Sequence, residues 1–86
     1  MRRYQVRLDS SARRQFRALP RDVQDRIQPA IDGLCDNPLP RASRKLQGGG
    51  GLYRLRVGSY RVVYTIHADV LIVRIIRIAH RREAYR

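Results

Sequence analysis

The sequence predicts an α+β fold in which a helical hairpin packs on one face of a small, mainly antiparallel sheet, in the order β-α-α-β-β-β. Three observations support this prediction. Residues 3–8 alternate between polar and apolar side chains, as a half-buried strand does. Residues 10–36 space their apolar side chains by three and four, as amphipathic helices do. Residues 52–79 are rich in β-branched and aromatic side chains and contain two short turn signals.

Two helices are expected after the first strand. Asp9 or Ser10 is the expected N-cap of the first helix, and Pro20 suits the first turn of the second. Pro29 removes one backbone hydrogen bond and is expected to kink the second helix, which should end at Asn37–Pro38. The apolar stripe of the second helix consists of Val23, Ile27, Ala30, Ile31 and Leu34. Its polar side carries the aspartates Asp22, Asp25, Asp32 and Asp36.

The C-terminal half is expected to form three strands, Leu52–Val57, Tyr60–His67 and Val70–Ala79. Gly58–Ser59 suits a two-residue hairpin turn of type II′, with glycine first. The third strand is apolar on both faces, which predicts a central position in the sheet. Residues 38–51, which include four consecutive glycines, are expected to form a mobile loop.

Length and composition indicate one domain, residues 1–86. A hydrophobic content of 43% is sufficient for a core and argues against disorder. Cys35 is the single cysteine, so a disulfide framework is excluded, which suits a reducing cytoplasm. We expect a cytoplasmic protein that does not enter a membrane, because no apolar run reaches the roughly 18 residues that span one.

The charge of the chain predicts a polyanionic partner. Lysine and arginine together number 19 against 7 acidic residues, which gives a net charge of +12. All of these bases except Lys45 are arginine, whose guanidinium group binds phosphate oxygens bidentately. Nucleic acid is therefore the first candidate partner and an acidic protein segment the second. GC-rich coding is the alternative explanation of the arginine excess.

Counting outward from the Gly58–Ser59 turn places Arg56 directly opposite Arg61. One face of this hairpin is apolar, and the other carries Arg54, Arg56 and Arg61 with no acidic residue in the hairpin to relieve their repulsion. We interpret the three arginines as an anion site. The alternative is a solvated outer face with splayed side chains.

The C-terminal residues offer two proton acceptors beside this basic surface. Histidine accepts protons near neutral pH, which makes His80 one candidate, and surrounding arginines favour the phenolate form of Tyr85. The alternative is a frayed terminal tail. Cys35, His67 and His80 are too few and too scattered to form a metal site, so no metal or other cofactor is expected.

Three segments carry a family resemblance: Lys45–Gly48, Leu52–Tyr64 and Ile78–Tyr85. Together they resemble the RelE family of toxins from bacterial and archaeal toxin–antitoxin pairs. The similarity extends over nearly the whole chain. Its most specific parts are the Tyr-Arg-Val-Val-Tyr strand and the His-Arg-Arg-Glu-Ala-Tyr end.

The resemblance implies a metal-independent endoribonuclease that cleaves messenger RNA at the ribosome by attack of a 2′-hydroxyl on the adjacent phosphate. It implies that Arg61 contacts the non-bridging oxygens and that Arg81 contacts the phosphate and the leaving 5′-oxygen. Tyr85 would be the base, with His80 as the alternate. Four further positions would bind RNA: Arg54, Arg56, Lys45 and Arg82. The positions of Arg54 and Arg56 are often lysine in characterised members, and arginine is a poorer acid or base.

The resemblance also implies partners. A co-encoded acidic antitoxin is expected to bind and silence the toxin, the ribosome and messenger RNA are the expected targets, and operator DNA is expected to be contacted only through the antitoxin complex. ParE-like toxins are the main alternative, since they are similar in shape but poison DNA gyrase. They tend to lack the pair that matches Arg81 and Tyr85. A non-catalytic nucleic-acid-binding protein is a second alternative.

Overall fold

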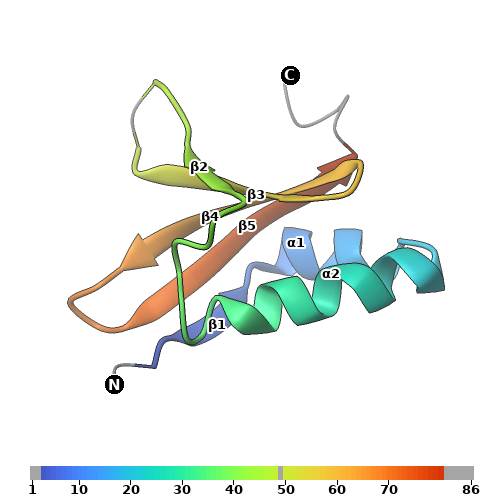
Figure 1. Ribbon diagram of the computed structural model, residues 1–86. Coiled ribbons are helices and arrows are strands. Elements are labelled where there is room, and N and C mark those ends of the chain that lie inside the picture. Colours follow the sequence, from blue (N-terminus) through green and yellow to red (C-terminus); the bar gives the residue numbers. More distant parts are fainter. Residues whose placement is uncertain (1–2, 49, 81–86) are drawn as a thin grey trace.

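The computed structural model of the chain describes residues 3–48 and 50–80. Two helices, α1 (Ser10–Arg17) and α2 (Arg21–Gly33), lie on one face of a five-stranded sheet (Figure 1). The strands are β1 (Gln5–Leu8), β2 (Ser43–Lys45), β3 (Leu52–Val57), β4 (Tyr60–His67) and β5 (Ile72–His80). Their order across the sheet is β1-β5-β4-β3-β2, and only the β1–β5 pair is parallel. The predicted fold class is therefore confirmed.

The strand β2 corrects one part of the prediction, because Ser43–Lys45 falls within the expected loop 38–51. A strand of three polar residues has too few positions to reveal an alternating pattern. It forms by pairing with β3, where Ser43 lies opposite Leu55 and Arg44 lies opposite Arg54. The sheet consequently has one more strand than expected, and β2 instead of β3 forms one of its two edges.

The helix ends differ from the prediction in two respects. Asp9 occupies the N-cap position of α1, but its side chain makes no capping hydrogen bond. Its carboxylate instead accepts hydrogen bonds from Arg74, with Oδ1 at 2.7 Å from Nε. The second helix continues through Pro29 but ends at Gly33, before the predicted stop at Asn37–Pro38.

The strand β5 lies between β1 and β4, as its apolar character on both faces predicted. It begins at Ile72 instead of Val70, directly after Leu71, which adopts a left-handed backbone conformation with φ of 55°. The pairing of β4 with β5 shifts between Val63 and Tyr64, so that β5 has one extra residue at that point.

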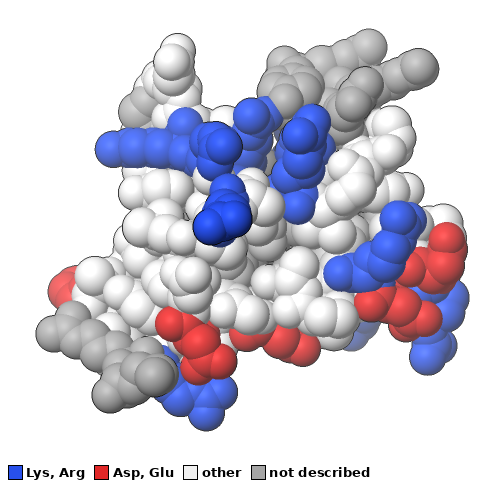
Figure 2. Space-filling view, viewed as in Figure 1, with Lys and Arg blue, Asp and Glu red and all other residues white. Residues whose placement is uncertain are grey.

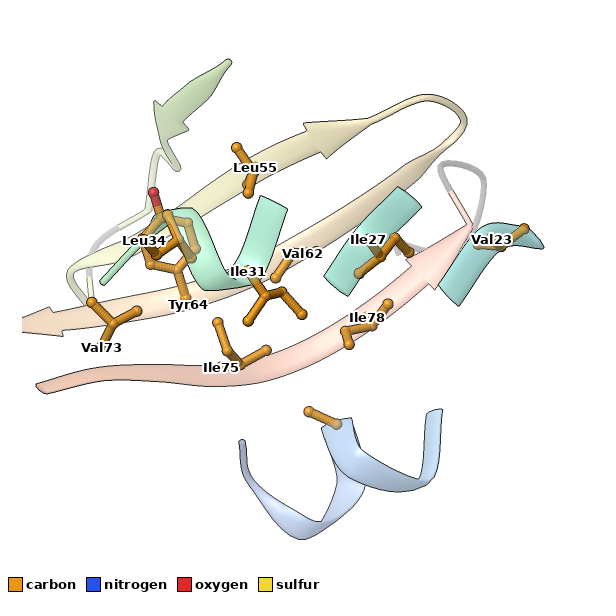
Figure 3. Close-up of a cluster of buried hydrophobic side chains, with 11 residues drawn as sticks. Val23, Ile27, Ile31, Leu34, Leu55, Val62, Tyr64, Val73, Ile75 and Ile78 are labelled. Carbon is orange, nitrogen blue, oxygen red and sulfur yellow. The ribbon is translucent and has the colours of Figure 1, made fainter. Parts of the chain in front are cut away.

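The core lies between the sheet and the helices, where Ile27 and Ile31 of α2 pack toward Val62 and Ile75 (Figure 3). Tyr64 is fully buried in this core, and its hydroxyl donates a hydrogen bond of 2.8 Å to the carbonyl oxygen of Pro38. This bond attaches the segment that leads into β2 to the centre of the sheet. Burial raises the pKa of the Tyr64 hydroxyl above its ordinary value.

Candidate nucleic-acid interface

The hairpin of β3 and β4 has the register that the sequence predicted. Val57 lies opposite Tyr60, and Arg56 lies opposite Arg61. Gly58 has a φ of 58°, which L-residues with a side chain rarely adopt, so glycine suits the first position of this turn. The tight turn holds the two facing arginines in a fixed relation.

The side of the sheet that faces away from the helices is the arginine face. Its hairpin arginines differ in exposure: Arg56 is exposed, Arg54 is half-buried, and Arg61 is only 2% exposed. The interpretation of all three as solvated, splayed side chains is thus wrong for Arg61. This residue lies on β4, the middle strand, with a neighbouring strand on either side. Its Nη1 donates a hydrogen bond of 3.2 Å to the carbonyl oxygen of Tyr60, which holds the guanidinium in place.

Four further arginines share this face by register, and sequence reasoning missed them. Arg44 lies opposite Arg54. Arg77 lies opposite Val63, Arg74 opposite Thr65, and Arg7 opposite Arg74. The arginine face thus crosses all five strands and consists of Arg7, Arg44, Arg54, Arg56, Arg61, Arg74 and Arg77.

The irregular pairing within β5 explains why two of these arginines were missed. Arg74 and Arg77 are three residues apart, and in a regular strand an odd spacing puts side chains on opposite faces. The extra residue in β5 between these positions restores the alternation, so both lie on the arginine face. Arg44 was missed because β2 itself was not predicted.

Lys45 is placed on the other side of the sheet. The register sets it opposite Tyr53, whose ring stacks on that of Tyr64 at 5.8 Å on the helix-covered side. The neighbouring residue, Arg44, takes the position on the arginine face. Lys45 is exposed and remains accessible to a partner, but it does not belong to the arginine cluster.

His80 also lies on the helix-covered side, opposite Tyr60 at the end of β5. The two rings meet edge to face with centroids 5.3 Å apart. They line a pocket of about 290 Å³ together with residues of α1 and the following turn, including Gln15 and Leu19. Three other predicted site residues, Arg81, Arg82 and Tyr85, lie outside the described residues.

Charge is distributed unevenly over the surface. Figure 2 shows basic side chains gathered over the part of the molecule that contains β2 and β3, whereas the acidic side chains lie along the part that contains α2, with basic side chains beside them at both ends. Four exposed aspartates account for the acidic character of α2 and the turn after it: Asp22, Asp25, Asp32 and Asp36. Two of these aspartates pair with arginines, Asp25 with Arg21 and Asp36 with Arg3. An extended anion would therefore be attracted more strongly to the arginine side of the molecule than to α2.

Two other features are absent from the part of the chain that the structure describes. Residues 3–48 and 50–80 contain no group of three or more histidine, cysteine, aspartate or glutamate side chains that could hold a metal ion. Nor is any helix in these ranges long and apolar enough to cross a membrane. Guanidinium groups fixed on a rigid sheet are suited to binding a phosphodiester and to stabilising negative charge that develops on it.

Known proteins with this sequence pattern and fold are toxins. The family model described as "ParE toxin of type II toxin-antitoxin system, parDE" matches residues 6–85. Toxin RelG of Mycobacterium tuberculosis is 32% identical over 84 residues, which cover 96% of this chain and 97% of that protein.

Two solved structures have the same fold. The toxin–antitoxin complex RelBE2 of Mycobacterium tuberculosis contains a chain with a TM-score of 0.82 and 32% identity, covering 94% of each chain. The archaeal RelE–RelB complex of Pyrococcus horikoshii contains one with a TM-score of 0.80 and 30% identity, covering 91% of this chain and 94% of that one. These matches define a class, the toxins of type II toxin–antitoxin systems. Within that class, the chain belongs to the RelE family.

Proposed function

We propose that this toxin is a metal-independent endoribonuclease that cleaves messenger RNA at the ribosome. The observation that carries the proposal is the fixed pair of Arg56 and Arg61 at the turn end of the arginine face, with Arg54 on the same strand as Arg56. Arg61 is almost completely buried and donates a hydrogen bond to a backbone carbonyl oxygen. Its guanidinium group is therefore already positioned, and little reorganisation is needed for it to stabilise negative charge in a transition state. The relatives carry RelE-type names, and the resemblance to the RelE family is what implies this activity.

The proposed reaction is an internal transfer. The 2′-oxygen of the RNA forms a bond to the adjacent phosphorus as its proton passes to the phenolate of Tyr85, and the bond from phosphorus to the 5′-oxygen breaks. Arg81 donates hydrogen bonds to the phosphate and to the leaving 5′-oxygen, which takes its proton from water, and Arg61 stabilises the charge on the non-bridging oxygens. The products are a 2′,3′-cyclic phosphate and a 5′-hydroxyl. Arg54 and Arg56 hold the RNA backbone.

The position of His80 favours Tyr85 as the base. His80 packs against Tyr60 on the helix-covered side, whereas the arginines that would hold the phosphate lie on the opposite side of the sheet. A general base must come within hydrogen-bond reach of the proton that it removes. We therefore keep His80 as the alternate, to be tested beside Tyr85.

We also propose a co-encoded acidic antitoxin as the partner that silences the toxin. Both solved structures described above are toxin–antitoxin complexes. A net charge of +12 favours an acidic partner segment, and covering the arginine face would block access of RNA. Operator DNA would be contacted only through this complex.

A second candidate function is poisoning of DNA gyrase, and the observation that favours it is the description of the matching family model as a ParE toxin. Both functions can be scored in one experiment. The chain is induced in cells, messenger RNA ends are mapped by primer extension, and gyrase-dependent DNA breaks are counted in parallel. Our proposal expects new RNA ends within translated regions and no added DNA breaks. The reverse pattern would assign the chain to gyrase.

A further inference from the structure

The arginine face has a second feature at its far end, where β4 and β5 are joined by residues 68–71. An open pocket of about 460 Å³ lies there. Its lining includes Arg7, Asp9, His67, Val70, Ile72 and Arg74. The register places Arg7, His67, Ile72 and Arg74 on the arginine face, so the pocket opens on the same side as Arg61.

The pocket combines groups that suit one nucleotide. Arg7 and His67 are exposed and can contact a phosphate or stack on a base. Val70 is 58% exposed, which is unusual for a large apolar side chain, and Ile72 adds further apolar surface. Apolar surface beside exposed cationic side chains matches a base attached to its phosphate.

Asp9 adds a hydrogen-bond acceptor to a pocket whose other polar side chains are mainly donors. Its two carboxylate oxygens accept hydrogen bonds from Arg74 Nε and Nη2, at 2.7 and 2.9 Å. The bidentate geometry orients the carboxylate, and each of its oxygens has a further lone pair that can accept a hydrogen bond. Such an oxygen can accept a hydrogen bond from the exocyclic amino group of a base.

The pocket is within reach of an RNA strand held at the turn end. Arg61 and Thr65 are four residues apart on β4, and Thr65 lies opposite Arg74, so the two ends of the face are separated by about 13 Å. Arg77 lies between them on the same face. A single strand bound at Arg61 therefore meets a continuous basic surface on its way to the pocket.

We propose that this pocket binds a nucleotide of the RNA substrate some distance from the bond that is cleaved. The proposal rests on the proposed ribonuclease function, in that it assumes RNA on the arginine face. Continuity with Arg61 and the exposed cations favour RNA over a protein segment as the occupant. The pocket contributes affinity and base preference, while the chemistry takes place at the turn end.

The test measures binding of single-stranded 2′-O-methyl RNA oligomers, which cannot be cleaved by 2′-attack. A dinucleotide and a decanucleotide are compared, with fluorescence anisotropy as the measurement. The pocket variant is Arg7→Gln with His67→Ala, and the matched control is Arg17→Gln, which removes an exposed arginine from α1. Thermal unfolding checks that each variant is folded.

We expect the pocket variant to bind the decanucleotide about tenfold more weakly than the parent protein does, and the dinucleotide equally well. The slope of log affinity against log salt should fall by about one for the long oligomer, because one phosphate contact is lost. The Arg17→Gln control should behave as the parent does at both lengths.

Equal affinity of parent and pocket variant for the decanucleotide would overturn the proposal. If the same variant then bound the antitoxin more weakly, the pocket would be assigned to a protein segment instead. The outcome is separable from the proposed activity, because the oligomers are not cleaved. If the parent protein left messenger RNA intact, but the pocket variant still lost affinity for the decanucleotide only, the pocket would remain assigned to RNA binding. The ribonuclease function would then be rejected.

Discussion

On β4, Arg61 and Tyr64 are both almost completely buried, but they lie on opposite faces of the sheet. Tyr64 is covered by apolar residues, including Leu34 of the segment after α2, and is kept neutral by that environment. Arg61 is a permanent charge among other arginines, and it is held by a backbone carbonyl. Burial on one face serves stability. On the other face it fixes the position of a charge.

The same contrast holds between adjacent residues of β2. Arg44 belongs to the arginine face and lies opposite Arg54, while Lys45 lies opposite Tyr53 on the helix-covered side. The guanidinium of Arg44 is itself positioned, because Nη1 donates hydrogen bonds to the carbonyl oxygens of Arg41 and Ser43 at 3.0 and 2.8 Å. Two basic residues that look equivalent in the sequence thus have different surroundings. Substitutions on the arginine face and on the helix-covered face should therefore have different effects.

The largest effect is expected when the base is removed. Tyr85→Phe should slow cleavage by about 10²–10⁴-fold with little change in ribosome affinity, because only a hydroxyl is lost. His80→Ala should slow it far less, since His80 lies on the helix-covered side. Single-turnover cleavage of ribosome-bound messenger RNA measures both. A fully active Tyr85→Phe protein together with an inactive His80→Ala protein would exchange the two roles.

Loss of the buried charge should come next. Arg61→Met keeps the approximate volume of the side chain and should reduce cleavage by about 10²–10³-fold, because a preorganised donor to the transition state is removed. Arg61→Lys should recover part of the rate, since it retains the charge but not the forked geometry. Circular dichroism must show that both variants are folded. Normal cleavage by folded Arg61→Met would exclude Arg61 from the chemistry.

The pair in β2 offers a matched test with a smaller effect. Arg44→Gln and Lys45→Gln remove the same charge from neighbouring residues on opposite sides of the sheet. Arg44→Gln should weaken RNA binding several-fold and lower the salt slope by about one, as the loss of a phosphate contact does. Lys45→Gln should leave both quantities close to those of the parent. Equal losses in the two variants would mean that RNA also follows the edge of β2.

The smallest effect concerns stability and the buried tyrosine. The folded protein keeps Tyr64 neutral, whereas the unfolded chain releases this proton from about pH 10 upward. The free energy of unfolding should therefore fall as the pH rises above about 10, toward the higher pKa of the folded state. Urea titrations should show a shallower decline in Tyr64→Phe. Identical slopes in the parent and in Tyr64→Phe would contradict the assignment.

Much of the fold was readable from local chemistry. The Gly58–Ser59 turn determines the pairing of β3 with β4, so the meeting of Arg56 and Arg61 followed from counting alone. The apolar character of β5 on both faces placed it inside the sheet correctly. These features depend on side chains close together in the sequence, where pattern and geometry are tightly linked.

What the sequence did not reveal depends on pairing between distant segments. β2 exists because Ser43–Lys45 pairs with β3, and its own three residues carry no strand pattern. The irregular pairing between Val63 and Tyr64 brings Arg74 and Arg77 to one face, which their spacing argues against. The burial of Arg61 likewise follows from the position of β4 at the middle of the sheet.

The most direct test of the account is an analysis of RNA ends after the purified toxin acts on ribosomes that carry a defined messenger RNA. The account predicts cleavage by the parent protein, with a 5′-hydroxyl on one product and a 2′,3′-cyclic phosphate on the other, and a loss of at least about 10²-fold in Arg61→Met. Intact messenger RNA with the parent protein, or products that carry a 5′-phosphate, would contradict it.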